Sequence, residues 1–535
     1  MGFTGNVSPS FSSVVDGWRS GFRAQLADLK RVPKPELGDV VGGVSVALVL
    51  IPQSLAYAGL AGLPPFLGLY AAAFPLVIFA IFASSPYLQT GPVALTSLLT
   101  AGALTSTGAI EESADYIEMA ALLALIVGVA RLLIGVLRLG SVVYLMAEPV
   151  TMGFTSGAGI VILTSQLPKA LGVVLPADVE AWGNPLRRAG WSALHPAEWE
   201  WSSIVISVIT LVLMLGGRKV HRLFPGVLVA VVVALLFSIG TDYDGPIVGE
   251  IDAGFPTFSL DLPFDQLGTL LVGGLVIALV GFAEPASIAR TFASEEQMHW
   301  SSSREFFASG MANMAAGITG AFPVGGSFSR SSVNRFAGAR TRWSGGITGI
   351  IILAFLPFSG LLEKLPLAVL GAIVVGAVLS LIKPMRLVAI GRRSPWQAAL
   401  AWVTFFATLL TPPQVQYAVM LGVGLTLILH VARRFHLEVE SNDVGELQLK
   451  PRGLLWIGTT TKLRDELRST IEANTGSGPV VVNLERTTAI DSFIADSLAS
   501  GGAEAAAAAG RDFWVSNAPD GAAGLLAHKK IAVVD

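Results

Sequence analysis

The chain has 535 residues, of which 53% are apolar and only 14% are charged, and its formal net charge is −3. Soluble proteins carry about 25% charged residues, so this composition excludes an ordinary soluble protein. The chain has no cysteine, which excludes disulfides and thiolate metal sites. Its histidines do not cluster with carboxylates at metal-ligand spacing. We therefore expect no metal, no cofactor and no nucleic-acid partner.

The first 36 residues are polar and contain a basic stretch that precedes the first long apolar run. No apolar segment with a small-residue cleavage site is found there, so a cleavable signal peptide is not expected. Residues 1–36 are predicted to form a cytoplasmic N-terminal segment that is partly amphipathic.

Apolar runs able to cross about 30 Å of hydrocarbon recur between residues 37 and 434. Basic residues follow alternate runs and the loop 241–266 is acidic, so the positive-inside rule places both termini in the cytoplasm. The runs at 91–106 and 325–337 are too short and polar to cross alone, which predicts half-helices buried in protein. The fourteen expected spans lie near 38–60, 66–84, 91–106, 117–137, 142–167, 202–216, 223–240, 267–290, 304–321, 325–337, 343–362, 366–382, 396–411 and 414–432.

Two segments of the chain repeat one another weakly. When residues 46–53 are placed over residues 277–284, the apolar pattern matches and Gln53 falls on Glu284. Nearly the same offset places Gly91 on Gly325. Seven spans per unit is an odd number, so the second unit enters the membrane from the opposite side. This predicts an inverted repeat, about 37–240 and 267–432, with the binding site at the interface of its halves.

The pattern changes after Arg434, where strand-like runs alternate with helix-like ones. Strands are expected at 446–450, 454–458, 479–484 and 513–516, and helices at 461–474 and 492–509. This alternation predicts a small α/β domain at 438–535 on the cytoplasmic side.

The second broken segment carries a cation, because Arg330 follows the glycines at 325 and 326. A charge at membrane depth is functional by default, and a guanidinium beside free helix N-termini would favour an anion. The alternative is an arginine that snorkels to a loop carboxylate. Ser327 likewise either contacts a ligand or caps the helix. Gly91 either allows a close backbone approach or makes a tight turn.

Glu284 lies in the middle of the eighth expected span. An ionised carboxylate at that depth is costly, so this side chain is a candidate for carrying a proton across the membrane. The alternative is a structural salt bridge to Arg330 or Arg290.

Four stretches carry a family resemblance. Residues 51–70 (IPQSLAYAGLAGLPPFLGLY) and 89–97 (QTGPVALTS) closely resemble the sulfate permease (SulP) anion transporters, the relatives of prestin and pendrin. Residues 326–330 (GSFSR) resemble the tenth-helix motif of that family, and residues 480–492 (VVVNLERTTAIDS) resemble its STAS domain. The resemblance implies an α-helical polytopic membrane protein of fourteen spans, divided into core and gate domains, that forms homodimers.

The resemblance also implies roles for single residues. Gln53 and Tyr57, which lie four residues apart on one helix face, and the amide of Val93 would border the anion. Ser329 and Arg330 would line the same site. Many family members have Phe at the position of Val93, so a roomier pocket is expected here.

The expected function is secondary active transport of a small anion, by alternating access, in a bacterial cytoplasmic membrane. A dicarboxylate such as fumarate, or sulfate, is the expected substrate, and Glu284 favours proton symport. The chain is not expected to be an enzyme. Alternatives of the same fold are a bicarbonate–sodium symporter, an anion exchanger and an anion channel. A nucleobase permease and a sensor with its C-terminal domain as output are further alternatives.

Overall fold

The computed structural model describes residues 34–534 except 141–147, 221–223, 242, 252–253, 299, 394, 433–435, 442–445, 453–454, 456–459, 475, 486, 488–489, 491, 520–521 and 530. Nearly all of the expected N-terminal segment and most of the expected strand at 454–458 therefore lie outside the described residues. The chain falls into two compact units. The first comprises Met1–Val143, Phe154–Lys383 and Thr404–Met420, and the second Tyr144–Gly153, Pro384–Val403 and Leu421–Asp535.

Each of the fourteen segments expected to span the membrane contains a helix. Five helical segments in the described part of the chain are long and apolar enough to cross a membrane unaided, and fourteen crossings stay a prediction. The helices are α2 (Leu37–Leu60), α3 (Phe66–Ala72), α4 (Phe74–Phe82), α5 (Ala94–Thr105), α6 (Ala114–Val136), α7 (Glu148–Leu171), α10 (Trp201–Leu211) continued by η3 (Val212–Gly216), α12 (Gly226–Gly240), α13 (Leu267–Glu295), α14 (Ser302–Ile318), α15 (Phe328–Phe336), α16 (Trp343–Phe355) continued by η5 (Leu356–Leu362), α17 (Leu367–Val378), α19 (Pro395–Leu410) and α20 (Gln416–Ala432).

Shorter helices connect these segments. They are α8 (Ala177–Glu180), α9 (Pro185–Leu194), η2 (Pro196–Glu198), α11 (Gly217–Val220), η4 (Phe264–Gln266) and α18 (Pro384–Arg393).

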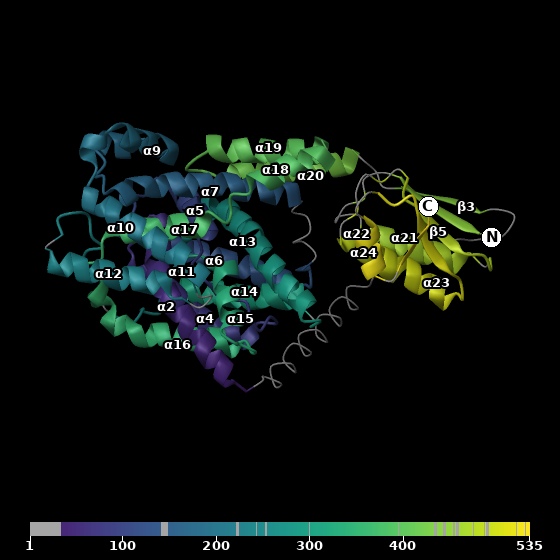
Figure 1. The fold of residues 1–535 in the computed structure, drawn as a ribbon, viewed down its shortest axis with the longest axis horizontal. Coiled ribbons are helices and arrows are strands. Elements are labelled where there is room, and N and C mark those ends of the chain that lie inside the picture. Colours follow the sequence, from purple (N-terminus) through teal and green to yellow (C-terminus); the bar gives the residue numbers. More distant parts are fainter. Residues whose placement is uncertain are drawn as a thin grey trace. The chain divides into compact units, whose positions relative to one another are not determined.

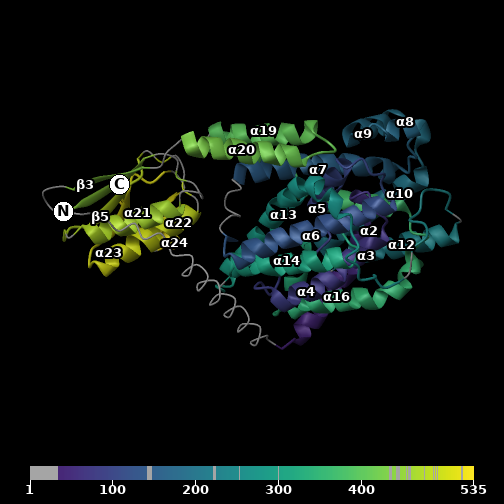
Figure 2. The ribbon, with the colours of Figure 1, turned by 180° about the vertical axis from the view of Figure 1, so that it is seen from behind.

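Most helices of the first unit sort into two groups by packing. The first bundle comprises α2–α6 and α13–α16, in which α6, α14, α4 and α16 follow one another across the unit (Figures 1 and 2). The second bundle comprises α10, α12 and α17, which pack on each other. The bundles meet where α2 contacts α12 and α17, and where α5 contacts α17. Helices from both halves of the sequence therefore interleave in the first bundle.

Small residues let α6 and α14 approach closely. A Cβ atom on Gly128 of α6 would lie 2.7 Å from the backbone nitrogen of Met314, and one on Gly310 of α14 would lie 2.6 Å from that of Leu132. Neither helix tolerates a side chain at these contacts. Close backbone approach through small residues is how membrane helices associate without a hydrophobic driving force.

The second unit contains a five-stranded sheet in the order β3 (His436–Ser441), β4 (Leu447–Arg452), β5 (Val480–Asn483), β6 (Phe513–Ser516) and β7 (Ala532–Val534). The first pair is antiparallel and the others are parallel. Parallel pairs need crossover connections. These are supplied by α21 (Thr460–Ala473), by α22 (Ser492–Ser497) with η6 (Leu498–Ala503) and α23 (Glu504–Ala508), and by α24 (Ala522–His528).

The core of this α/β part consists of buried aliphatic side chains on the strands and on α21. The strands expected at 446–450, 479–484 and 513–516 are present within a residue or two, and so are both expected helices. The strands β3 and β7 were not predicted from the sequence.

Candidate functional site

Two short strands lie at the centre of the first bundle. β1 (Thr90–Gly91) pairs with β2 (Gly325–Gly326) in antiparallel register, with Thr90 opposite Gly326 and Gly91 opposite Gly325. Helix α5 begins at Ala94, just after β1, and α15 begins at Phe328, just after β2. Since the strands run in opposite directions, the two helices start from the same place and point away from each other. The sequence prediction of two interrupted segments agrees with this geometry.

The backbone at this centre requires glycine. Gly91 has φ +129°, in the region that only glycine adopts readily. A Cβ atom there would lie 3.2 Å from Leu76 Cδ1 and 3.6 Å from Arg330 Nη2. The guanidinium of Arg330 therefore lies directly against the backbone of β1.

The N-termini of α5 and α15 carry no side-chain caps. Val93 and Ser327 occupy the N-cap positions, and neither side chain accepts a hydrogen bond from its helix. The Ser327 hydroxyl instead lies 3.4 Å from that of Ser329. Capping by the Ser327 side chain, the alternative weighed from the sequence, is wrong. The first-turn N–H groups of α5, and those of α15 after Phe328, have no side-chain cap and can therefore face a ligand.

Arg330 supplies a positive charge beside these helix ends. Its side chain is 1% exposed, and Nη1 donates to the Pro92 carbonyl at 2.9 Å. Its Nε and Nη2 groups have no hydrogen-bond partner, and Arg330 forms no ion pair with a described carboxylate. The alternative of an arginine that snorkels to a loop carboxylate is therefore wrong. A buried guanidinium with two open donors is costly unless a ligand or water completes its shell.

Helix α2 contributes Gln53 and Tyr57. Gln53 is 1% exposed, and both its amide oxygen and its amide nitrogen lack partners. Tyr57 is buried and lies within electrostatic range of both Arg330 and Glu284. Helix α2 contacts both α5 and α15. Tyr57 therefore lies near Arg330, and a role of Gln53 and Tyr57 in anion binding stays a prediction.

Val93 lies against the second strand of the pair. Its side chain is buried, and its Cγ2 atom lies 3.1 Å from where a Gly325 Cβ would stand. Val93 therefore packs on β2, with its backbone at the start of α5.

Glu284 lies on α13, immediately before the helix-internal Pro285. The backbone of Phe328, the first residue of α15, lies within interaction range of its carboxyl group, as do the charges of Arg330 and Lys383. The salt bridge to Arg330, weighed from the sequence, is not formed, because the Arg330 donors are bonded to Pro92 or unpartnered. The Glu284 carboxyl and the Arg330 guanidinium thus both lie near the start of α15, and they form no direct ion pair with each other.

Sequence reasoning missed several buried polar groups near these residues. The hydroxyls of Ser97 and Thr100 are buried without partners, one and two turns along α5 from Val93. Ser97 is the last residue of the motif at 89–97, and Thr100 follows it by three residues. Their spacing from Val93, close to one and two helical turns, could have indicated that they share its helix face. Arg131, fully buried on α6, was also missed, although a lone cation in an apolar run is itself a signal.

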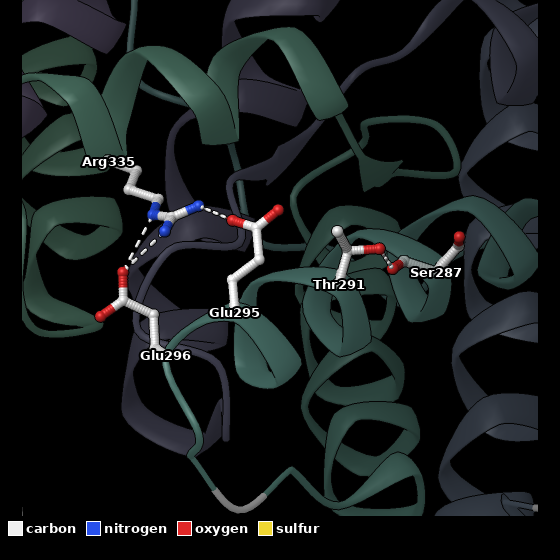
Figure 3. A network of polar contacts seen from close by, with 5 residues as sticks. All are labelled: Ser287, Thr291, Glu295, Glu296 and Arg335. Atoms are coloured by element: carbon white, nitrogen blue, oxygen red, sulfur yellow. Dashed lines mark hydrogen bonds and ion pairs between the residues drawn. The ribbon is translucent and has the colours of Figure 1, made fainter. Parts of the chain in front are cut away.

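A cavity of about 740 Å³ lies along α15, from Phe328 at its start to Arg340 beyond its end. Arg335 is held there by Glu295 and Glu296 from the end of α13 (Figure 3). Its guanidinium also lies 5.0 Å from the ring centroid of Phe292. Figure 3 shows Thr291 and Ser287 on the turns of α13 before Glu295, where the Thr291 hydroxyl donates to the Ser287 carbonyl.

Comparison with known proteins identifies relatives over most of the chain. The model of the "Sulfate permease family" matches residues 37–404. The chain is 33% identical to the chloroplastic sulfate transporter 4.1 of Arabidopsis thaliana, over 84% of this chain and 64% of that protein. It is 35% identical to a probable sulfate transporter of Mycobacterium tuberculosis, over 74% of this chain and 70% of that protein. The matches thus span about two thirds of these relatives.

Two solved structures share the fold. The murine solute carrier 26 family member A9 in an inward-facing state matches 98% of this chain and 92% of its own, with a TM-score of 0.70 and 19% identity. The transmembrane domain of the cyanobacterial bicarbonate transporter BicA matches 73% of this chain and 96% of its own, with a TM-score of 0.61 and 25% identity. The helical transporter fold expected from the sequence is therefore present. The chain belongs to the sulfate permease family, and it is a membrane transporter of anions and not an enzyme.

Proposed function

We propose that this chain is a secondary active transporter of sulfate, with a dicarboxylate such as fumarate as the next candidate substrate. The observation that carries the proposal is Arg330, a buried guanidinium with two unpartnered donors between two uncapped helix N-termini. The curated relatives described above are named as sulfate transporters, which favours sulfate over fumarate.

The open donors fit an oxyanion in number and kind. Arg330 offers Nε and Nη2, and Gln53 offers its amide nitrogen. Hydrogen bonds between a guanidinium and an oxyanion are about twice as strong as neutral ones, and the planar fork suits two oxygens at once. These groups, with the first-turn amides of α5 and α15, would replace the hydration shell of the anion.

Glu284 is proposed to carry one proton with each anion. Its carboxyl group lies beside the start of α15 and forms no ion pair with a described cation. The positive charges of Arg330 and Lys383 lie within electrostatic range of it. When the anion binds, their positive potential is neutralised, so binding of the anion and protonation of Glu284 favour each other. Coupled binding of this kind makes symport possible.

Alternating access would use the two bundles as moving parts. The first bundle, which holds Arg330 and Glu284, would serve as the core domain, and the second as part of the gate domain. The cavity along α15 is proposed as the cytoplasmic access route, with both termini in the cytoplasm of a bacterial cell. A homodimer, and a STAS domain at 438–535, complete the proposal.

A bicarbonate–sodium symporter is the second candidate, favoured by the likeness to the BicA transmembrane domain. Tracer uptake into proteoliposomes separates the two. Sulfate, fumarate and bicarbonate would be offered under a pH gradient alone and under a sodium gradient alone. The proposal expects sulfate uptake driven by the pH gradient, and bicarbonate uptake driven only by sodium would contradict it.

A further inference from the structure

A second arginine lies behind the site, fully buried and surrounded only by neutral partners. Arg131 on α6 is 0% exposed. Its Nε donates to the Ala278 carbonyl at 3.1 Å and its Nη2 to the Ile277 carbonyl at 3.0 Å. Its Nη1 donates to the Ser309 hydroxyl and to the Val324 carbonyl, both at 2.9 Å. The hydrogen bonds are satisfied, but no described carboxylate neutralises the charge.

Arg131 joins three helices to one strand. Ala278 and Ile277 lie on α13, Ser309 on α14, and Val324 directly precedes β2. Asn313, one turn after Ser309 on α14, also binds the backbone of Val324. Its Nδ2 donates to the Val324 carbonyl at 3.2 Å, and its Oδ1 accepts from the Val324 amide at 2.9 Å. The entry to β2 is therefore fixed by one charged and one neutral side chain.

The guanidinium of Arg131 lies next to the wall of the anion site. A Cβ on Gly281 would stand 2.8 Å from Arg131 Nη2 and 2.9 Å from Thr96 Cγ2, so the guanidinium neighbours the first turn of α5. A Cβ on Gly325 would stand 3.2 Å from Thr96 Cγ2 and 3.1 Å from Val93 Cγ2. The guanidinium thus contacts the residue before β2 directly, through the Val324 carbonyl, and neighbours Thr96 on α5. Since Val324 lies three residues before Ser327, the charge lies on the order of 10 Å from the start of α15.

We propose that Arg131 is a second fixed positive charge of the anion site, which acts through the field without touching the anion and selects dianions over monoanions. This inference rests on the proposed anion site at Arg330. An arginine stays charged in proteins, and at about 10 Å with an effective dielectric constant near 20 its field favours binding about tenfold per unit of anion charge. Its removal would weaken dianion binding about a hundredfold and monoanion binding about tenfold.

A matched pair of substitutions at Ser309 separates charge from structure. Ser309→Asp places a carboxylate against Arg131 Nη1 and neutralises its field, while the arginine stays in place. Ser309→Asn has nearly the same size and adds no charge. The Kd values of sulfate and of perchlorate, two tetrahedral oxyanions with charges of −2 and −1, would be measured on the purified full-length chain. We expect the preference for sulfate over perchlorate to fall about tenfold in Ser309→Asp relative to Ser309→Asn.

Asn313→Ala is the second control, because it removes a tether of Val324 without changing charge. It should alter the affinities for both anions by the same factor, whereas Arg131→Gln should alter the preference as Ser309→Asp does. If the preference for sulfate over perchlorate is unchanged in both Ser309→Asp and Arg131→Gln, the proposal is overturned, and the role of Arg131 is structural only. If neither anion bound to the unsubstituted chain, the proposed anion site itself would be wrong, which is a different outcome. Should Ser309→Asp fail to fold, the comparison of Arg131→Gln with Arg131→Lys, which keeps the charge, decides the same question.

Discussion

Substitution of Glu284 by Gln tests the proposed proton coupling. The amide is nearly isosteric with the carboxyl and mimics its protonated form. Its oxygen can still face the Phe328 backbone, which lies within interaction range of the carboxyl group. The local structure should therefore persist. Because the negative charge within range of Arg330 is lost, sulfate should bind at least as tightly as before.

The magnitude follows from the coupling stoichiometry. If one proton accompanies each anion, every pH unit across the membrane contributes about 1.4 kcal/mol, which corresponds to a tenfold accumulation of anion. Glu284→Gln carries no proton, so its accumulation ratio should not respond to the pH gradient.

The assay is uptake of labelled sulfate into proteoliposomes, with the membrane potential clamped and the pH gradient varied. Glu296→Gln is the matched control, because it lies on the turn after α13 and pairs with Arg335; its response to the pH gradient should be that of the unsubstituted protein. Persistent pH-driven accumulation by Glu284→Gln would refute the assignment of Glu284.

Three other substitutions give distinct signatures. Gly91→Ala combines an unfavourable φ with a Cβ close to Leu76 and Arg330, so the Kd for sulfate should rise at least tenfold, about 1.4 kcal/mol; unchanged affinity would contradict the close approach. Gln53→Leu removes a buried amide without partners, so thermal stability in detergent should hold or rise while sulfate affinity falls about tenfold; lower stability with unaltered affinity would argue for a structural role. Asp39 accepts the Arg340 and Thr341 amides and the Thr341 hydroxyl, so Asp39→Ala should cost about 3 kcal/mol of stability; a calorimetric melting temperature equal to that of the unsubstituted protein would show that these bonds are dispensable.

The interrupted segments could be predicted from the sequence because their causes are local. Gly91 and Pro92 break one helix, and the glycines at 325 and 326 break the other, wherever the rest of the chain lies. The placement of Arg330 required a choice between a buried ligand group and a snorkelling cation. The structure excludes the snorkelling position, because the buried side chain is bonded to the carbonyl of Pro92, which is 238 residues away and invisible to local patterns.

The support around the site could not be predicted, for the same reason. Arg131 finds its acceptors 146 to 193 residues along the chain, and the packing of α6 on α13 and α14 brings them within reach. Ser327 was correctly placed at a helix start, but its hydroxyl turns to Ser329 instead of capping. Strand β7 is three residues long and exposed, so it carries no buried-strand pattern.

The central claim is that one buried guanidinium between two helix starts binds the anion. The most direct measurement is equilibrium binding of sulfate to Arg330→Ala, compared with Arg340→Ala, which removes an arginine whose side chain is 74% exposed. We expect Arg330→Ala to weaken binding at least a hundredfold, since truncating one partner of a buried charge pair costs about 3 kcal/mol, and Arg340→Ala to leave binding unchanged. Sulfate affinity in a folded Arg330→Ala protein equal to that of the unsubstituted chain would contradict the account.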